Sequence, residues 1–193
     1  MKYFLTLSLT FLFINACNTH KERIQNNYFN ILNMLKADIA TLYKNKAILI
    51  KVVKSGAKAD NIKMKKPDWN LELEFFNKLN ISSPELEGKY RVDTTIIFSK
   101  KQDSTIIGKR IIYTATEDEL PVQELVVEFN SDKVLQHFTG KTVITRFLKT
   151  VTKTYDYTPL TAFSVNAEEM TKWFGTSTYS VEGTIYFEEP YFQ

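Results

Sequence analysis

From Tyr90 onward the chain alternates between two kinds of side chain, and this period of two constrains the fold more than any other feature. In the first run one face would carry Tyr90, Val92, Thr94, Ile96 and Phe98, and in the last run Tyr179, Val181, Gly183, Ile185 and Phe187. Successive side chains of a strand point to opposite faces, so both runs predict strands with one buried face, as in an antiparallel sheet. Further strands are expected at roughly 105–115, 121–130, 133–139, 142–155 and 160–169, between turn-forming stretches.

The first residues have the order of a secretory signal. Lys2 precedes an apolar run that is too short to span a membrane as a permanent helix. The sequence Ile14-Asn15-Ala16-Cys17 then resembles the lipobox of bacterial lipoproteins, in which the signal is cut before a cysteine whose sulfur carries a diacylglycerol. The resemblance implies that residues 1–16 are removed, that Cys17 is lipidated and that 17–23 form a short tether. The alternative is a signal peptide with an incidental cysteine.

Lipidation of Cys17 would have consequences for the rest of the chain. It is the only cysteine, so no thiol would remain for a disulfide, a metal site or a nucleophile. Asn18, rather than Asp, follows it, and by analogy with enteric bacteria this favours the outer membrane over the inner one. The formal net charge of +3 is too small to favour nucleic acid as a partner.

Two segments before the sheet have helical periodicity. In 24–44 apolar residues recur every three or four positions, which predicts an amphipathic helix. Such a helix could lie on a bilayer, but its polar face is rich in Asn, so we expect it to pack on the protein. A second helix is expected over 68–79, because Asp68 is a typical N-cap residue. Between the two helices, 47–53 and 61–64 predict a β-hairpin.

These elements predict an α+β fold in a single domain over residues 24–193. Its centre is a long antiparallel sheet of about seven strands plus the N-terminal hairpin, covered by two helices. An open sheet of this length is expected to curl.

The stretch DWNLELEFFNKLNISSPELEGKY (68–90) is similar to a segment of small uncharacterised lipoproteins of the Bacteroidota. The matching residues are Asp68, Trp69, Glu72, Leu73, Phe76, Asn80, Ile81, Pro84 and Tyr90, and later Leu160, Phe163 and Val165. Ala167 and Glu168-Glu169 depart from the Gly and Gln usual in the family. The resemblance implies an architecture and a location in the cell envelope, and it assigns no activity.

Two tripeptides fit the O-glycosylation pattern of exported proteins of the same phylum. They are Asp93-Thr94-Thr95 and Asp103-Ser104-Thr105. Thr94 is expected to point inward on its strand, whereas Ser104 falls in a turn. Ser104 is therefore the candidate O-glycosylation site.

Glu72 stands out because it falls inside the apolar arc of the second helix. An isolated buried charge is costly, so we expect the carboxylate to be bound by backbone N–H groups, a Tyr or an Arg. The alternative is an acid with a perturbed pKa in a pocket. Trp69, Glu72 and Phe76 are the candidate surface for a ligand or partner, bordering the place where helices and sheet meet.

No residue pattern indicates catalysis, a metal or a cofactor. Apart from His20 in the tether, His137 is the only histidine, so a His-rich metal site cannot form. His137 is interpreted as an exposed strand residue. The sequence also lacks a phosphate-binding loop and a calcium-loop spacing.

The sequence therefore predicts a lipid-anchored protein of the cell envelope. We expect it to act as a non-enzymatic binding or interaction module, attached to the membrane through Cys17. One alternative is a carrier of a lipid or other apolar ligand, by analogy with curled sheets closed by helices. The other is a hydrolase that uses His137 or Glu72.

Overall fold

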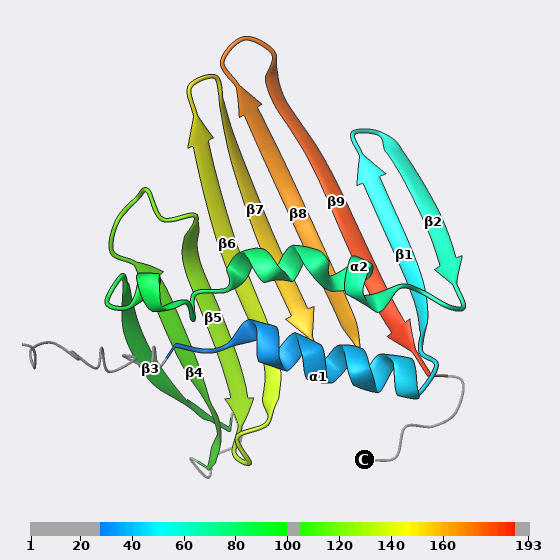
Figure 1. Cartoon of the computed structure of the whole chain (residues 1–193), viewed down its shortest axis with the longest axis vertical. Coiled ribbons are helices and arrows are strands. Elements are labelled where there is room, and N and C mark those ends of the chain that lie inside the picture. Colours follow the sequence, from blue (N-terminus) through cyan, green and yellow to red (C-terminus); the bar gives the residue numbers. More distant parts are fainter. Residues whose placement is uncertain (1–27, 100–104, 188–193) are drawn as a thin grey trace, which may run out of the picture.

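The computed structural model describes residues 28–99 and 105–187 (Figure 1). The predicted signal peptide, Cys17, the tether and Ser104 lie outside these ranges. In the described residues nine strands form one antiparallel sheet, in the order β2-β1-β9-β8-β7-β6-β5-β4-β3. The strands are β1 (Ile48–Ser55), β2 (Lys58–Met64), β3 (Tyr90–Phe98), β4 (Ile106–Ala115), β5 (Val122–Asn130), β6 (Leu135–Arg146), β7 (Lys149–Thr158), β8 (Ala162–Thr171) and β9 (Gly175–Tyr186).

The topology is an open meander to which the N-terminal hairpin adds two strands. Each strand from β3 to β9 pairs with the next one along the chain, and β1 then pairs with β9. The first hairpin is therefore an extension of the sheet at the end of its last strand. The predicted α+β class with a long antiparallel sheet is confirmed.

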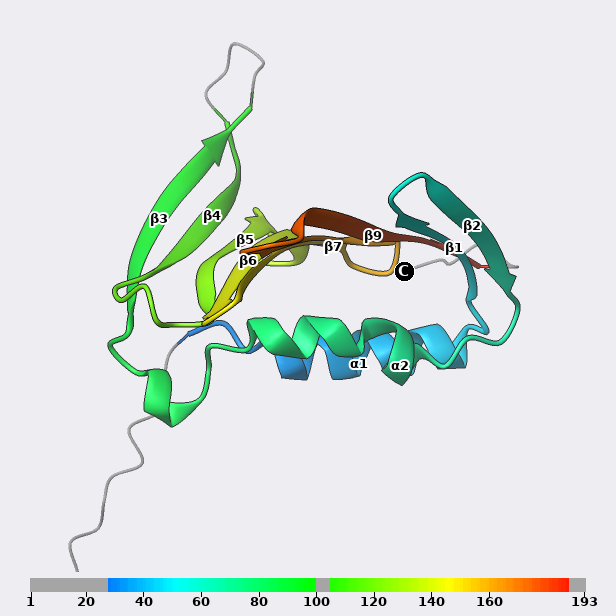
Figure 2. The same ribbon diagram turned by 90° about the horizontal axis from the view of Figure 1, so that it is seen from above.

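In the described residues, all helices lie on one face of the sheet (Figure 2). They are α1 (Ile31–Lys44), α2 (Trp69–Leu73) and the 3₁₀ helices η1 (Glu74–Leu79) and η2 (Pro84–Leu86). Within the described part of the chain, none of the helices is long and apolar enough to cross a membrane.

The first helix begins later than its periodicity suggested. Asn30 is the N-cap, and its side-chain oxygen accepts the N–H of Asn33 at 3.0 Å. Just before it, the Tyr28 hydroxyl donates to the Tyr90 carbonyl oxygen at 3.1 Å and accepts the Tyr90 N–H at 3.2 Å. Tyr28 thus fixes the entering chain to β3 and lies before the helix. Residues 24–27 of the predicted helix lie outside the described residues.

The second predicted helix is divided in two. It is α-helical only as far as Leu73 and continues as a 3₁₀ helix to Leu79. Within the 3₁₀ part, Phe76 is fully buried, and its ring centroid lies 5.3 Å from that of Phe138 and 5.1 Å from that of Tyr157. These rings fill the space between η1 and the middle of the sheet.

Gly140 explains both a tight contact and an error in the predicted strands. A Cβ at this position would lie 2.5 Å from Leu79 Cδ2, so only glycine lets η1 pack this closely on the sheet. The sequence predicted a break between strands at residues 139–142, but β6 continues through Gly140 and is 12 residues long. The chain instead turns at Phe147 and Leu148.

The helices cover only part of one face of the sheet. On β3 only Tyr90 is buried, whereas Val92, Ile96 and Phe98 are 46, 43 and 54% exposed. Thr94, which was expected to point inward, is also exposed. Figure 2 shows the hairpin β3–β4 rising away from the helical layer, and Figure 1 shows the ends of β6–β9 projecting beyond it. The expectation of one buried face along the entire length of these strands is therefore wrong.

A partly buried polar contact joins α1 to the sheet. The hydroxyl of Tyr157, which is fully buried on β7, donates to Asp38 Oδ2 at 2.7 Å. Burial raises the pKa of the Asp38 carboxyl, and the hydrogen bond from Tyr157 opposes this effect only in part. Burial also raises the pKa of Tyr157, so its hydroxyl stays protonated and remains a donor.

Asp38 makes the stability of the domain depend on pH. Because the pKa of this carboxyl is raised, the folded state holds the proton more tightly than the unfolded chain, and stability falls as the pH rises above the ordinary value of 3.8. Asp38→Asn cannot titrate, yet it can still accept the Tyr157 hydroxyl. In urea unfolding between about pH 3 and 7, the free energy of unfolding of the wild type should therefore decline relative to that of Asp38→Asn. A constant difference would contradict the assignment.

Candidate binding site at the start of the second helix

Asp68 organises the junction between the two helices. Its Oδ1 accepts the N–H groups of Asn70 at 3.1 Å and Leu71 at 3.5 Å, as an N-cap residue does. Tyr43, in the last turn of α1, donates its hydroxyl to the same oxygen at 2.9 Å and accepts the Trp69 N–H at 3.0 Å. The hydrogen bond from Tyr43 is the largest of several that lower the pKa of Asp68. The carboxylate thus stays ionised and ties the end of α1 to the start of α2.

A surface pocket of about 630 Å³ lies at this junction. It is lined by Leu42, Tyr43, Lys46, Ala47, Lys65, Lys66, Pro67, Asp68 and Trp69. Leu42, Ala47 and Trp69 lie beneath it and are almost completely buried, whereas the Tyr43 ring is 45% exposed. The lining also contains three lysines and one carboxylate, that of Asp68, which is already bonded. The pocket therefore suits a ligand with an apolar body and a negative group.

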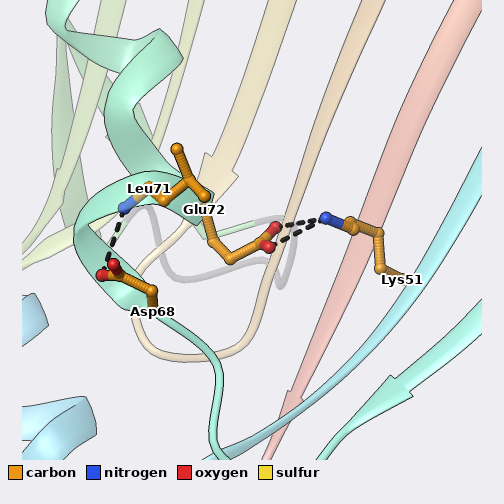
Figure 3. Close-up of polar contacts among 4 residues, drawn as sticks. All are labelled: Lys51, Asp68, Leu71 and Glu72. Atoms are coloured by element: carbon orange, nitrogen blue, oxygen red, sulfur yellow. Dashed lines mark hydrogen bonds and ion pairs between the residues drawn. The ribbon is translucent and has the colours of Figure 1, made fainter.

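Glu72 points the other way, toward β1. Its Oε1 and Oε2 lie 2.8 and 2.7 Å from Lys51 Nζ (Figure 3). The two side chains are only 8 and 17% exposed. The carboxylate is paired as expected, but the partner is a lysine and not a backbone N–H, a Tyr or an Arg. The ion pair fastens α2 to the sheet.

The structure does not bring the three candidate residues to one surface. Trp69 lines the pocket, Glu72 is bound to Lys51, and Phe76 is completely buried in the aromatic core. Sequence reasoning missed the lysines because Lys65 and Lys66 look like a solvated hairpin end. They acquire a site only because the end of α1 passes beside them.

His137 lies on the face of the sheet that the helices leave open. It is half-buried rather than exposed, and its Nε2 lies 3.0 Å from Asp156 Oδ2. Ser164 is opposite Asp156 on β8, and Glu128 is opposite His137 on β5. Asp156 therefore stands between the histidine and the serine, whereas a catalytic triad requires the histidine in the middle.

Metal ligation and known relatives give no further guide to the site. In residues 28–99 and 105–187 no three His, Cys, Asp or Glu side chains are grouped so that they could hold a metal ion. Comparison of the chain with protein-family models, curated proteins and solved structures gave no match. The resemblance to lipoproteins of the Bacteroidota stays a prediction, and function has to be argued from the residues.

The pair Lys51–Glu72 should stabilise the attachment of α2. Lys51→Met or Glu72→Leu alone leaves one charge unpaired, and we expect each to lower the free energy of unfolding by about 2 kcal/mol, less than for a fully buried pair because Lys51 retains contact with water. The double variant should lose clearly less than the sum, as measured by urea unfolding. Lys54→Met, which breaks the half-exposed pair with Glu182, is the control and should cost at most about 1 kcal/mol. Strict additivity would contradict this role.

Proposed function

We propose that the protein is a lipid-anchored protein of the bacterial cell envelope, attached through Cys17, and that its domain acts by non-covalent binding. The observation that carries the anchor is the sequence Ile14-Asn15-Ala16-Cys17 behind an apolar signal. One acyl chain holds a protein to a bilayer only marginally, since each buried CH₂ contributes about 0.8 kcal/mol, but two or more chains hold it firmly. Asn18 after the cysteine favours the outer membrane.

The pocket at the start of α2 is the binding site that we assign to the domain. Tyr43, which is 45% exposed, offers apolar contact above the nearly buried Leu42, Ala47 and Trp69. The ammonium groups of Lys46, Lys65 and Lys66 favour a negative charge. Long-chain carboxylates and acidic lipid fragments combine these two properties. Proteins bind such molecules in sites with apolar walls and a few placed polar groups.

The same pocket favours a carrier of an apolar ligand as the second candidate function. The core itself leaves no room for such a ligand near η1, because Phe76, Phe138 and Tyr157 occupy that space. A carried molecule would therefore sit in the surface pocket and would have an exposed end. Nothing comparable favours a hydrolase, since His137 lacks the geometry of a triad and Glu72 is paired with a lysine.

The anchor can be tested by metabolic labelling. Cells that express the wild-type chain and are fed radiolabelled palmitate should yield a labelled protein, whose mass lacks residues 1–16 and includes the lipid. Cys17→Ser should abolish the label, because the hydroxyl cannot replace the thiolate that receives the diacylglycerol. Asn18→Ala, one residue along, should remain labelled. An unlabelled wild-type protein would refute the lipid anchor.

The pocket can be tested with dodecanoate as a probe. Isothermal titration should show saturable binding, and Lys65→Ser/Lys66→Ser should weaken it about tenfold, because one lost charge contact is worth roughly 1.4 kcal/mol. Lys63→Ser, near the end of β2, is the control, since this residue does not line the pocket. Dodecanol should bind both variants alike. Equal dodecanoate affinity in the double variant and the control would remove the pocket from the proposal.

A further inference from the structure

Two neighbouring hairpin tips carry the most exposed large apolar side chains of the described residues. Phe147 at the turn β6–β7 is 91% exposed, and Trp173 and Phe174 at the turn β8–β9 are 71 and 91% exposed. Leu148, beside Phe147, is 43% exposed. Figure 1 shows the two turns adjacent to each other at the end of the sheet that projects beyond the helices. We call these four residues the tip patch.

Hydrogen bonds fix the tip patch in place. The Lys172 N–H donates to the Leu148 carbonyl oxygen at 3.0 Å, which joins the two turns. Within the second turn, Thr171 Oγ1 accepts the Phe174 N–H and donates to the Gly175 carbonyl oxygen, both at 3.1 Å. Gly175 has a φ of +77°, a conformation that glycine adopts without strain, so the turn is unstrained at this residue. These bonds fix the backbone of the turns that carry the exposed rings.

Positive charge surrounds the tip patch. The segment 145–150 contains Arg146 and Lys149, and the segment 170–176 contains Lys172, while neither segment contains Asp or Glu. Lys149 is paired with Glu169, whose carboxylate lies 3.1 Å from Lys149 Nζ, so Arg146 and Lys172 supply the excess positive charge. A patch of aromatic rings with basic side chains beside it matches a surface that is apolar inside and negative outside.

We propose that the tip patch is a membrane-contacting surface, which inserts Phe147, Trp173 and Phe174 into the headgroup region of a bilayer containing anionic lipid. Trp is enriched at membrane interfaces, Phe and Leu insert beside it on the apolar face of interfacial segments, and nearby Lys and Arg are attracted to anionic headgroups. The exposed area also favours a membrane over a protein partner. Three rings present roughly 500 Å², which is less than the 800 Å² or so that one partner contributes to a standard protein interface. Two copies meeting at this patch would bring like charges together.

The contact is compatible with the proposed anchor and does not depend on it. Ten residues, 18–27, separate Cys17 from the described chain, and this length reaches at most about 35 Å. Tyr28 packs on Tyr113, which lies at the level of Gly140 in the sheet, and Gly140 is six residues from Arg146 along β6, or about 20 Å. Anchor and tip patch could therefore reach the same bilayer.

The test uses the mature chain, residues 17–193, with Cys17→Ser, so that binding is measured without the anchor. Vesicles of phosphatidylcholine with about one third phosphatidylglycerol should bind this protein and shift the Trp emission to the blue. Only Trp173 should respond, because Trp69 is 1% exposed. Trp173→Phe should therefore still bind in co-sedimentation but lose the spectral shift. Lipids brominated near the headgroup should quench Trp173.

Removing the apolar side chains should abolish most of the binding. Phe147→Ser/Trp173→Ser/Phe174→Ser should weaken vesicle binding at least tenfold in co-sedimentation, with an unchanged circular dichroism spectrum and unfolding midpoint because these side chains are exposed. Leu71→Ser, on α2, and Val134→Ser, at the opposite end of the sheet, are the controls and should bind like the parent. Arg146→Gln/Lys172→Gln should lose affinity only for the anionic vesicles.

Three results would overturn the proposal. The first is equal binding by the tip variant and the Leu71→Ser control, and the second is a Trp173 emission that vesicles leave unchanged. The third is self-association in the absence of vesicles that disappears in the tip variant, which would assign the tip patch to a second copy of the chain. None of these results bears on whether Cys17 is lipidated.

Discussion

The aromatic packing between η1 and the sheet is the contact on which the two layers depend. Phe76 reaches the rings of Phe138 and Tyr157 from a helix only six residues long, and Leu79 seats against Gly140. A helical layer this narrow cannot cover strands of up to 12 residues. The fold is therefore divided into a packed half and a half in which the sheet stands alone. The pocket lies at the margin of the packed half, and the tip patch lies beyond it.

Polar side chains cover much of the sheet surface that the helices leave in contact with water, in contrast to the apolar residues at the hairpin tips. The edge strand β2 is exposed along nearly its whole length and carries Lys, Asp and Asn, as expected of an edge protected against pairing with other chains. The open face of β7 carries Thr150, Thr152 and Thr154, polar residues that favour extended backbone. Val92, Ile96 and Phe98 are also exposed, but by at most 54%. The three rings at the hairpin tips are 71 to 91% exposed. Phe147, Trp173 and Phe174 are therefore better explained by a contact than by poor packing.

Alternation along the chain was sufficient to predict the strands but not their environment. The period of two identifies which residues share a face of the sheet. It places Lys51 on the same face as the buried Leu49, and a lysine on that face needs a carboxylate partner such as Glu72. It cannot say how far a helix extends over that face, so Val92 and Ile96 were assigned to a core that does not reach them. The wrong prediction of a turn at Gly140 has a related reason. A glycine that marks close packing and one that marks a turn look the same in a sequence.

The pocket and the tip patch lie at opposite ends of the sheet, and this separation bears on how the protein would work. Ala47, in the pocket, immediately precedes β1, whose first residue pairs with Tyr186 at the end of β9, whereas the tip patch adjoins Gly175 at the start of β9. Twelve residues of strand correspond to about 40 Å. A bilayer touching the tip patch would therefore leave the pocket in solvent, well clear of the headgroups. A ligand would then reach the pocket and its lysines from the aqueous side, and the domain would hold that ligand at a distance from the bilayer.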